Sequence, residues 1–385
     1  MKKWVLFICM LTYSIIVEAQ GERIHILKQI ESLQTINSKD FPNGAFPSYR
    51  KYQYGSSFKA DYNLFYTALT IYNIERYRSF LSNEELSILA NIKSKALPYF
   101  ELFKNKKNNL TYNFWPKYHA EVFPNGGWLN NFNKMNALPD DIDDCSILML
   151  ALGNQDSLVG AMKIKFLDFI NTKNKKSKGF YRKYKNDPVY STWLGNGYPI
   201  DIDISVLSNV LLMNYSYQQN LNKNDTASLN LIIDLLKTNK HLTDPHYASQ
   251  HYSNSATIIY HITRLMQYSN YEPLLKLKPI LLEQSKALLI KSQYDLEKLL
   301  LINSIMQLGE QYDKTEINGT YNDLNMGTND YPYFVANMTA ILNNPFKRFF
   351  AATKLGRFSY YSNAFNLSLL FEYEILKTKL NTSIN

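Results

Sequence analysis

The sequence predicts an all-α fold, because long apolar segments recur along the chain at helical spacing. Two kinds of segment alternate: one is apolar on nearly every face and suits a buried helix, and the other is amphipathic and suits a helix with a solvent face. Of the 385 residues 45% are hydrophobic, and only 14 are glycine and 13 proline, which argues against a turn-rich β fold. Inner and outer rings of helices satisfy both kinds of segment, so we expect a single α/α toroid of about six hairpins over 20–385.

The helices are expected in chain order, and the nearly uniformly apolar ones begin near 61, 141, 201, 254, 295 and 362. Local signals mark their ends: Asp61 is a candidate N-cap, Gly153 suits a helix end, Pro279 suits a first turn and Gly309 suits a stop. The full set of expected helices is 61–74, 83–103, 141–152, 158–170, 201–213, 225–236, 253–266, 279–291, 295–308, 334–342 and 362–376.

The connections between these helices carry few strand signals. Residues 180–184 and 189–193 could form one small hairpin in a loop, and nothing indicates the parallel sheet of a two-layer α/β fold. The long connections at 105–139 and 173–200 are expected to lie over one rim of the toroid, where functional residues concentrate.

Residues 1–19 have the pattern of a secretory signal peptide. Lys2 and Lys3 precede an uncharged, mostly apolar run over 4–17, and Val17 and Ala19 place small residues around a cleavage site. The run is short for a membrane span, although an uncleaved anchor is the alternative. Export to the periplasm or the medium is therefore expected, and cleavage leaves 366 of the 385 residues and lowers the net charge from +9 to +8. No later segment is apolar enough to span a membrane.

The positive charge is densest between residues 173 and 185, which contain six lysines and one arginine. Such a run usually forms a solvated loop. Export argues against a nucleic-acid partner, whereas an acidic polysaccharide or an anionic lipid stays open. Only Cys145 remains after cleavage, so no internal disulfide is expected.

Four carboxylates stand just before one of the buried helices, at Asp140, Asp141, Asp143 and Asp144. Helix capping and the helix dipole explain one or two of them. Close like charges raise one another's pKa, and a raised pKa lets a carboxylic acid hold a proton near neutral pH and donate it. The cluster therefore predicts a general acid, with simple capping as the alternative.

The run Asp141-Ile142-Asp143-Asp144-Cys145-Ser146 resembles the D-x-D-D-T-A motif of class II terpene cyclases. Gly126-Gly127-Trp128 resembles the end of that family's repeat motif. The resemblance implies an α/α toroid of the terpenoid cyclase and prenyltransferase superfamily, with isomerase activity. It also implies that Asp143 protonates an isoprenoid substrate while Asp141 and Asp144 tune it. The abundant aromatic side chains could stabilise a carbocation.

Other interpretations of the same residues stay open. A glycan hydrolase or lyase could use Asp143 or Asp144 with Asp203 as an acid/base pair, and a non-catalytic binding toroid would use the acids as caps only. The run from Asp140 to Asp144 also fits a D-D-x-x-D magnesium motif, but Ile232 stands where the second motif needs an acid. A zinc site of Asp143, Cys145 and either His246 or His251 is a further, weaker match. We predict no cofactor and no metal.

Polar and aromatic residues precede several of the inner helices, whose N-termini would meet at one rim. Capping does not explain the aromatic residues, so we expect a cavity mouth there. It would take a small isoprenoid or glycan, with a protein partner left open. The candidate substrate-binding residues are Trp128, Trp193, Tyr198, His251, Tyr252 and Tyr361.

Overall fold

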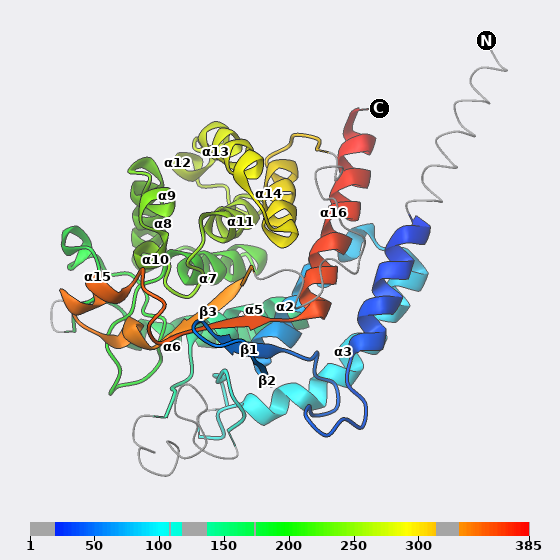
Figure 1. Cartoon of the computed structure of the whole chain (residues 1–385), viewed down its shortest axis with the longest axis horizontal. Helices are drawn as coiled ribbons and strands as arrows, with labels where there is room; N and C mark the ends of the chain where they lie inside the picture. The colour runs from blue at the N-terminus through cyan, green and yellow to red at the C-terminus, as the bar shows by residue number, and fades with distance from the viewer. Residues whose placement is uncertain (1–19, 108, 118–136, 173–174, 313–330, 385) are drawn as a thin grey trace.

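The computed structural model describes residues 20–384 except 108, 118–136, 173–174 and 313–330. The expected signal peptide and Trp128 lie outside the described residues. The described chain is mostly helical, and a small antiparallel sheet lies against one end of the helices (Figure 1).

Largely buried helices are present at all six places where the sequence predicts them. Each contacts the next along the chain, and the last contacts the first, so the contacts close into a cycle. The buried helices are α2 (Leu64–Glu75), α5 (Ile142–Leu152), α7 (Ile204–Ser216), α11 (Ser255–Met266), α14 (Asp295–Gln307) and α16 (Asn363–Ile384).

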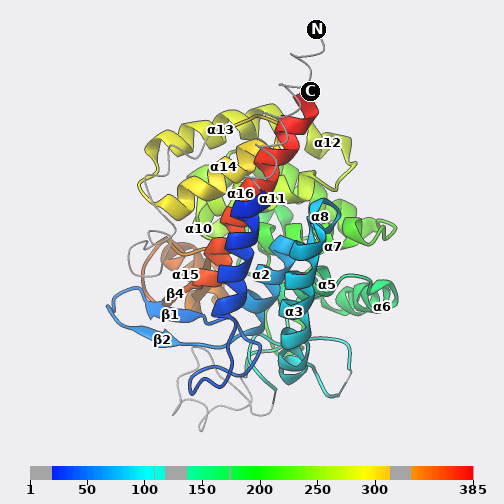
Figure 2. The same ribbon diagram turned by 90° about the vertical axis from the view of Figure 1, so that its right-hand side faces the viewer.

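Amphipathic helices cover these buried helices from outside. They are α3 (Asn83–Phe100), α6 (Asp156–Phe166), α8 (Lys223–Lys237) and α13 (Lys278–Lys291). A further helix over 20–33 lies between α3 and α16, as Figure 2 shows. Its Arg23 donates to Glu85 of α3 at 2.8 Å and to Thr378 of α16 at 3.3 Å.

Short helical turns fill the connections. They are η1 (Arg78–Phe80), η2 (Glu101–Phe103), η4 (Leu167–Phe169), η5 (Arg182–Tyr184), α9 (Lys240–Thr243), α10 (Pro245–Ala248), α12 (Glu272–Leu275), η8 (Met338–Ile341) and α15 (Phe346–Phe350).

The all-α prediction is wrong in one respect, because the chain also forms a four-stranded antiparallel sheet in the order β2-β1-β4-β3. Strand β1 near the N-terminus pairs with β4 near the C-terminus, with Tyr49 opposite Tyr361. Such short strands give little local signal, and their pairing is non-local. The strands are β1 (Tyr49–Tyr52), β2 (Phe58–Ala60), β3 (Phe334–Asn337) and β4 (Arg357–Tyr361).

Two further local predictions are wrong. The helix expected over 334–342 is instead strand β3 followed by the turn η8, because β3 pairs with β4. The hairpin expected over 180–193 does not form; Tyr190 bridges to Ile170 and Trp193 bridges to Asp141.

Two helices begin later than the sequence predicts. Asn63, and not Asp61, caps α2, accepting from the Tyr66 N–H at 3.1 Å. The helix expected over 201–213 is α7, which is capped by Asp203. A capping side chain must stand directly before the first helical turn, and Asp61 and Asp201 stand two residues too early. Each of them makes other contacts.

A single connected hydrophobic core runs from Ile26 to Leu376 and includes residues of every buried helix. In the part of the chain that the structure describes, no helix is long and apolar enough to cross a membrane.

Candidate functional site

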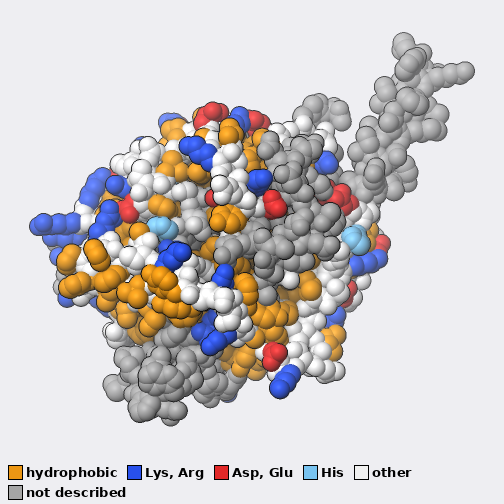
Figure 3. All heavy atoms as spheres, viewed as in Figure 1, with side chains coloured by type: hydrophobic (Ala, Val, Ile, Leu, Met, Phe, Trp, Pro, Cys, Tyr) orange, Lys and Arg blue, Asp and Glu red, His pale blue; other side chains and the backbone are white. Residues whose placement is uncertain are grey.

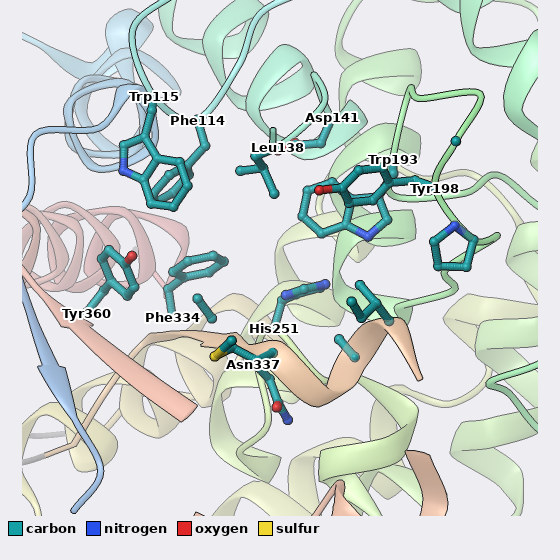
Figure 4. A pocket seen from close by; sticks show the side chains of 16 residues that line it. Phe114, Trp115, Leu138, Asp141, Trp193, Tyr198, His251, Phe334, Asn337 and Tyr360 are labelled. Atoms are coloured by element: carbon teal, nitrogen blue, oxygen red, sulfur yellow. The ribbon is translucent and has the colours of Figure 1, made fainter. Parts of the chain in front are cut away.

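A cavity of about 360 Å³ opens where α5, α11 and α16 begin (Figure 4). Its walls come from segments just before these helices and from strand β3. Most of its lining is apolar, and six aromatic side chains dominate it: Phe114, Trp115, Trp193, Tyr198, Phe334 and Tyr360.

Three polar side chains also line the cavity: Asp141, His251 and Asn337. Figure 4 shows Asp141 across the cavity from His251, with Trp193 and Tyr198 on one side. Asp141 is the one carboxyl among the described lining residues. A backbone β-bridge pairs Asp141 with Trp193, so the two residues lie side by side at the cavity wall.

Asp141 caps helix α5, and its Oδ1 accepts the Asp144 N–H at 2.7 Å. Burial raises the pKa of Asp141, and the nearby charge of Asp143 adds to this. Burial also raises the pKa of Asp144 well above its usual range, and the nearby charge of Asp141 adds to this. The Asp144 Oδ2 atom is buried without a hydrogen-bond partner among the described residues. Two buried carboxyls this close repel each other when both are ionised, which favours a proton on one of them.

Asp143 is buried behind Asp141 and does not line the cavity. Its Oδ1 accepts the Asn209 amide at 2.7 Å, and its Oδ2 accepts the Tyr252 hydroxyl. Burial raises the pKa of Asp143 to about 6, although both hydrogen bonds act to lower it. The Asp143 carboxyl therefore faces protein groups. The residue that the resemblance implies as general acid does not line the cavity.

Asp203 is buried as well and holds other chain segments in place. It accepts from the Ser205 N–H at 2.9 Å, from the Ser249 hydroxyl at 2.6 Å and from the His251 N–H at 2.9 Å. Asp203 thus fixes the backbone of His251 and does not face the cavity.

His251 lines the opposite part of the cavity wall and contacts a buried carboxylate behind it. Its Nε2 lies 3.2 Å from Asp201, which also pairs with the buried Lys347 at 2.9 Å. Burial lowers the pKa of His251, but Asp201 and Asp203 raise it more, so the net shift is upward. Burial raises the pKa of Asp201, but Lys347 and His251 outweigh it and hold this pKa below its usual range.

Asp140, the first acid of the cluster, ties down a loop. It accepts from Thr111 at 2.6 Å and from Asn113 at 3.4 Å, and it pairs with Lys117 at 3.1 Å. These contacts hold the segment that carries Phe114 and Trp115 against the cavity.

The predicted substrate-binding residues separate into two groups. Trp193, Tyr198 and His251 line the cavity. Tyr252 lies behind it, with its hydroxyl on Asp143, and Tyr361 is buried in β4 against Phe58. Trp128 lies outside the described residues.

Several cavity residues were not predicted. Trp115 lines the wall, and its indole Nε1 donates to Asp61 at 3.0 Å. Phe114 stacks on Phe334, with ring centroids 5.6 Å apart. Phe114 and Trp115 are adjacent aromatic residues in the 105–139 connection, and this pattern could have indicated them. Phe334 and Tyr360 belong to the unpredicted sheet.

The described residues give no support to a metal site. Cys145 is buried, and its sulfur accepts the Tyr112 N–H at 3.2 Å. No group of three His, Cys, Asp or Glu side chains in the described ranges is arranged to hold a metal ion.

Comparisons of the chain with protein-family models, with curated proteins and with solved structures give no significant match.

Proposed function

We propose that the chain is an exported α/α toroid whose inner ring is α2, α5, α7, α11, α14 and α16. The closed cycle of contacts between these helices supports this arrangement. So does the alternation of buried and solvent-facing helices along the chain. The pattern of residues 1–19 supports export.

For the cavity we propose acid catalysis on a small apolar substrate of the isoprenoid class. The observation that carries this proposal is the Asp141 carboxyl in a mostly aromatic wall, with the buried Asp144 directly behind it on the same helical turn. Burial and the repulsion between these carboxyls raise the pKa of both and favour the protonated form, which is the state that a general acid needs. Asp141 is the donor, because its carboxyl faces the cavity.

The proposed reaction is an isomerisation that needs no co-reactant. The π electrons of a substrate alkene form a new C–H bond with the Asp141 proton, which leaves a carbocation on the neighbouring carbon. The faces of Trp115, Trp193 and Phe334 stabilise that cation. A further double bond of the substrate can close a ring, and the Asp141–Asp144 pair then takes a proton back.

Asp143 and His251 have supporting roles in this proposal. Asp143 adds negative charge behind Asp141 and so helps to raise its pKa. His251, paired with Asp201, places its ring against Trp193 at 5.6 Å and nearly perpendicular to it. It therefore fixes the indole that faces the substrate.

Glycan binding is the second candidate, favoured by one observation. The Trp193 indole Nε1 is buried without a hydrogen-bond partner among the described residues, and Tyr198 lies 5.8 Å from its ring. Such a pair suits a stacked sugar with a hydroxyl acceptor. The second carboxylate that a glycosidase needs does not face the cavity in the described residues.

Mass spectrometry of the purified protein with isoprenoid and oligosaccharide panels tests both candidates. Asp141→Asn should reduce isoprenoid product formation by roughly a hundredfold or more, because the proton donor is lost. The control Asp156→Asn changes an exposed carboxyl at the start of α6 and should leave the rate unchanged. Equal product from Asp141→Asn and the parent protein would refute the acid assignment, and product from sugars alone would favour the second candidate.

A further inference from the structure

An apolar surface projects from the segment that borders the cavity. In helix α15 the Phe346 and Phe349 side chains are 64% and 73% exposed. Figure 3 shows apolar side chains gathered over this part of the molecule. Exposed aromatic residues close together are typical of a docking surface and are uncommon on a face that meets only water. We call this surface the α15 patch, and it consists of Ile341, Leu342, Phe346, Phe349 and Leu355.

The α15 patch is held firmly from below. Lys347 points inward between the two exposed phenylalanines and pairs with the buried Asp201 at 2.9 Å. Arg348 pairs with Asp244 and stacks on Tyr247 at 4.4 Å. Because these contacts fix the helix, the phenylalanine rings stay on the outside.

A basic loop lies directly beside the α15 patch. The Asn344 N–H donates to the Lys178 carbonyl at 2.8 Å, and the Asn344 amide donates to the Phe180 carbonyl at 3.2 Å. The approach is so close that a Cβ on Gly179 would lie 2.6 Å from Cδ of Lys347. Residues 175–185 contain six Lys or Arg and no acidic residue, and Figure 3 shows basic side chains next to the apolar ones.

We propose that the α15 patch and the basic loop dock the protein on an anionic lipid surface. Aromatic side chains next to lysines and arginines are the combination that binds the interface of an anionic membrane. A protein partner would need an acidic rim around an apolar pocket, whereas anionic lipid supplies both chemistries everywhere on its surface. Charge complementarity therefore favours lipid.

The patch also reaches the cavity. Met338 and Ile341 are exposed and line the cavity as well. A lipid-borne apolar molecule would thus meet the cavity mouth at the docking surface. This second step rests on the proposed function, whereas the docking itself does not.

Vesicle co-sedimentation tests the docking. The chain from Gln20 is suitable because it contains every residue of the hydrophobic core, and because the apolar run over 4–17 would bind lipid by itself. We expect binding to vesicles that contain phosphatidylglycerol, little binding to phosphatidylcholine alone, and weaker binding at high salt. No binding to the anionic vesicles would overturn the proposal.

Two sets of variants separate the apolar and charged parts. Phe346→Ser with Phe349→Ser should weaken vesicle binding roughly tenfold or more. The matched control, Ile164→Ser with Ile290→Ser, removes side chains that are 71% and 84% exposed on α6 and α13 and should bind as the parent does. Equal effects of the two pairs would contradict the proposal.

The basic loop is tested by changing Lys176, Lys178 and Arg182 to Gln together, which should reduce the binding and its salt dependence. The control changes Lys276, Lys278 and Lys291 to Gln, at the end of α12 and in α13, which lie apart from α15 at the top of Figure 1. Circular dichroism melts check that each variant folds. A dimer that dissociates only in the phenylalanine variant would show that the patch joins two copies of the chain, and this would also overturn the proposal.

The outcome is distinguishable from that of the acid proposal. Asp141→Asn should bind vesicles as the parent does, because Asp141 is not part of the patch. The phenylalanine variant should still turn over a detergent-dissolved substrate. Loss of vesicle binding in Asp141→Asn would contradict the docking proposal.

Discussion

Asp143 lies inside the protein with its carboxylate between the Tyr252 hydroxyl and the Asn209 amide. Asp141, two residues earlier, faces the cavity, and Asp144, one residue later, is buried with its Oδ2 atom unpartnered in the described part of the chain. The three carboxyls stand on one helical turn, so each points in a different direction. Their roles therefore differ although their sequence context is the same.

The first prediction concerns Asp143 and pH. Its pKa rises from 3.8 to about 6 in the folded protein, chiefly through burial. A carboxyl with a raised folded-state pKa adds stability that is fully present below its unfolded pKa and is lost as the pH rises through the folded value. The free energy of unfolding should therefore fall by about 3 kcal/mol from this residue between about pH 3.5 and pH 7.

Urea unfolding of the parent and of Asp143→Asn across this pH range isolates the contribution. The variant keeps a similar shape but cannot titrate, so the difference between the two proteins should shrink or reverse as the pH rises. A difference that does not change with pH would show that Asp143 is not shifted.

Helix α15 shows how one element depends on a buried charge. This helix has only five residues and is too short to be stable alone. Its inward-facing Lys347 meets Asp201, and Asp201 in turn contacts His251 at the cavity wall. The element that carries the α15 patch is therefore connected to the cavity.

The second prediction is that Lys347→Met lowers the free energy of unfolding by about 3–5 kcal/mol, because it leaves Asp201 buried without its main partner. Lys347→Met with Asp201→Asn should cost less than Lys347→Met alone, since both charges are gone. Equilibrium unfolding in urea measures both. A double variant that is less stable than the single one would indicate that shape, and not charge, decides the stability.

At the scale of the whole molecule, one carboxylate joins four of the six buried helices. Glu372 of α16 accepts from Tyr77 after α2 at 2.9 Å, from Tyr260 of α11 at 2.5 Å and from Gln307 of α14 at 2.6 Å. Arg76, the C-cap of α2, pairs with it at 3.1 Å. These contacts join α16 to both of its neighbours in the helix cycle and to α11 beyond α14.

The third prediction is that Glu372→Ala destabilises the protein by about 3–5 kcal/mol, because Arg76 is left buried without its counterion. Lys377→Ala, an exposed position on the same helix, should change stability by less than about 0.5 kcal/mol. Thermal and urea unfolding measure both variants. A small effect of Glu372→Ala would mean that the helix cycle is held by apolar packing alone.

Much of the helical architecture could be predicted from the sequence. The starts of α5, α11, α14 and α16 lie within about one residue of their predicted places, because a buried helix leaves a dense apolar pattern in a short stretch of chain. The start of α2 is displaced because Asp61 binds Trp115 and Asn63 caps the helix. Capping choice depends on contacts with distant residues, which the local pattern does not contain.

The sequence by itself determined the order of buried and amphipathic helices and the position of the acidic cluster, since both are written in neighbouring residues. Only the tertiary structure decided that Asp141 faces the cavity and that Tyr49 pairs with Tyr361. Both outcomes depend on segments far apart in the chain. Which side of a helix turn meets a cavity, and which strands pair, follows from the packing of the whole core and not from local periodicity.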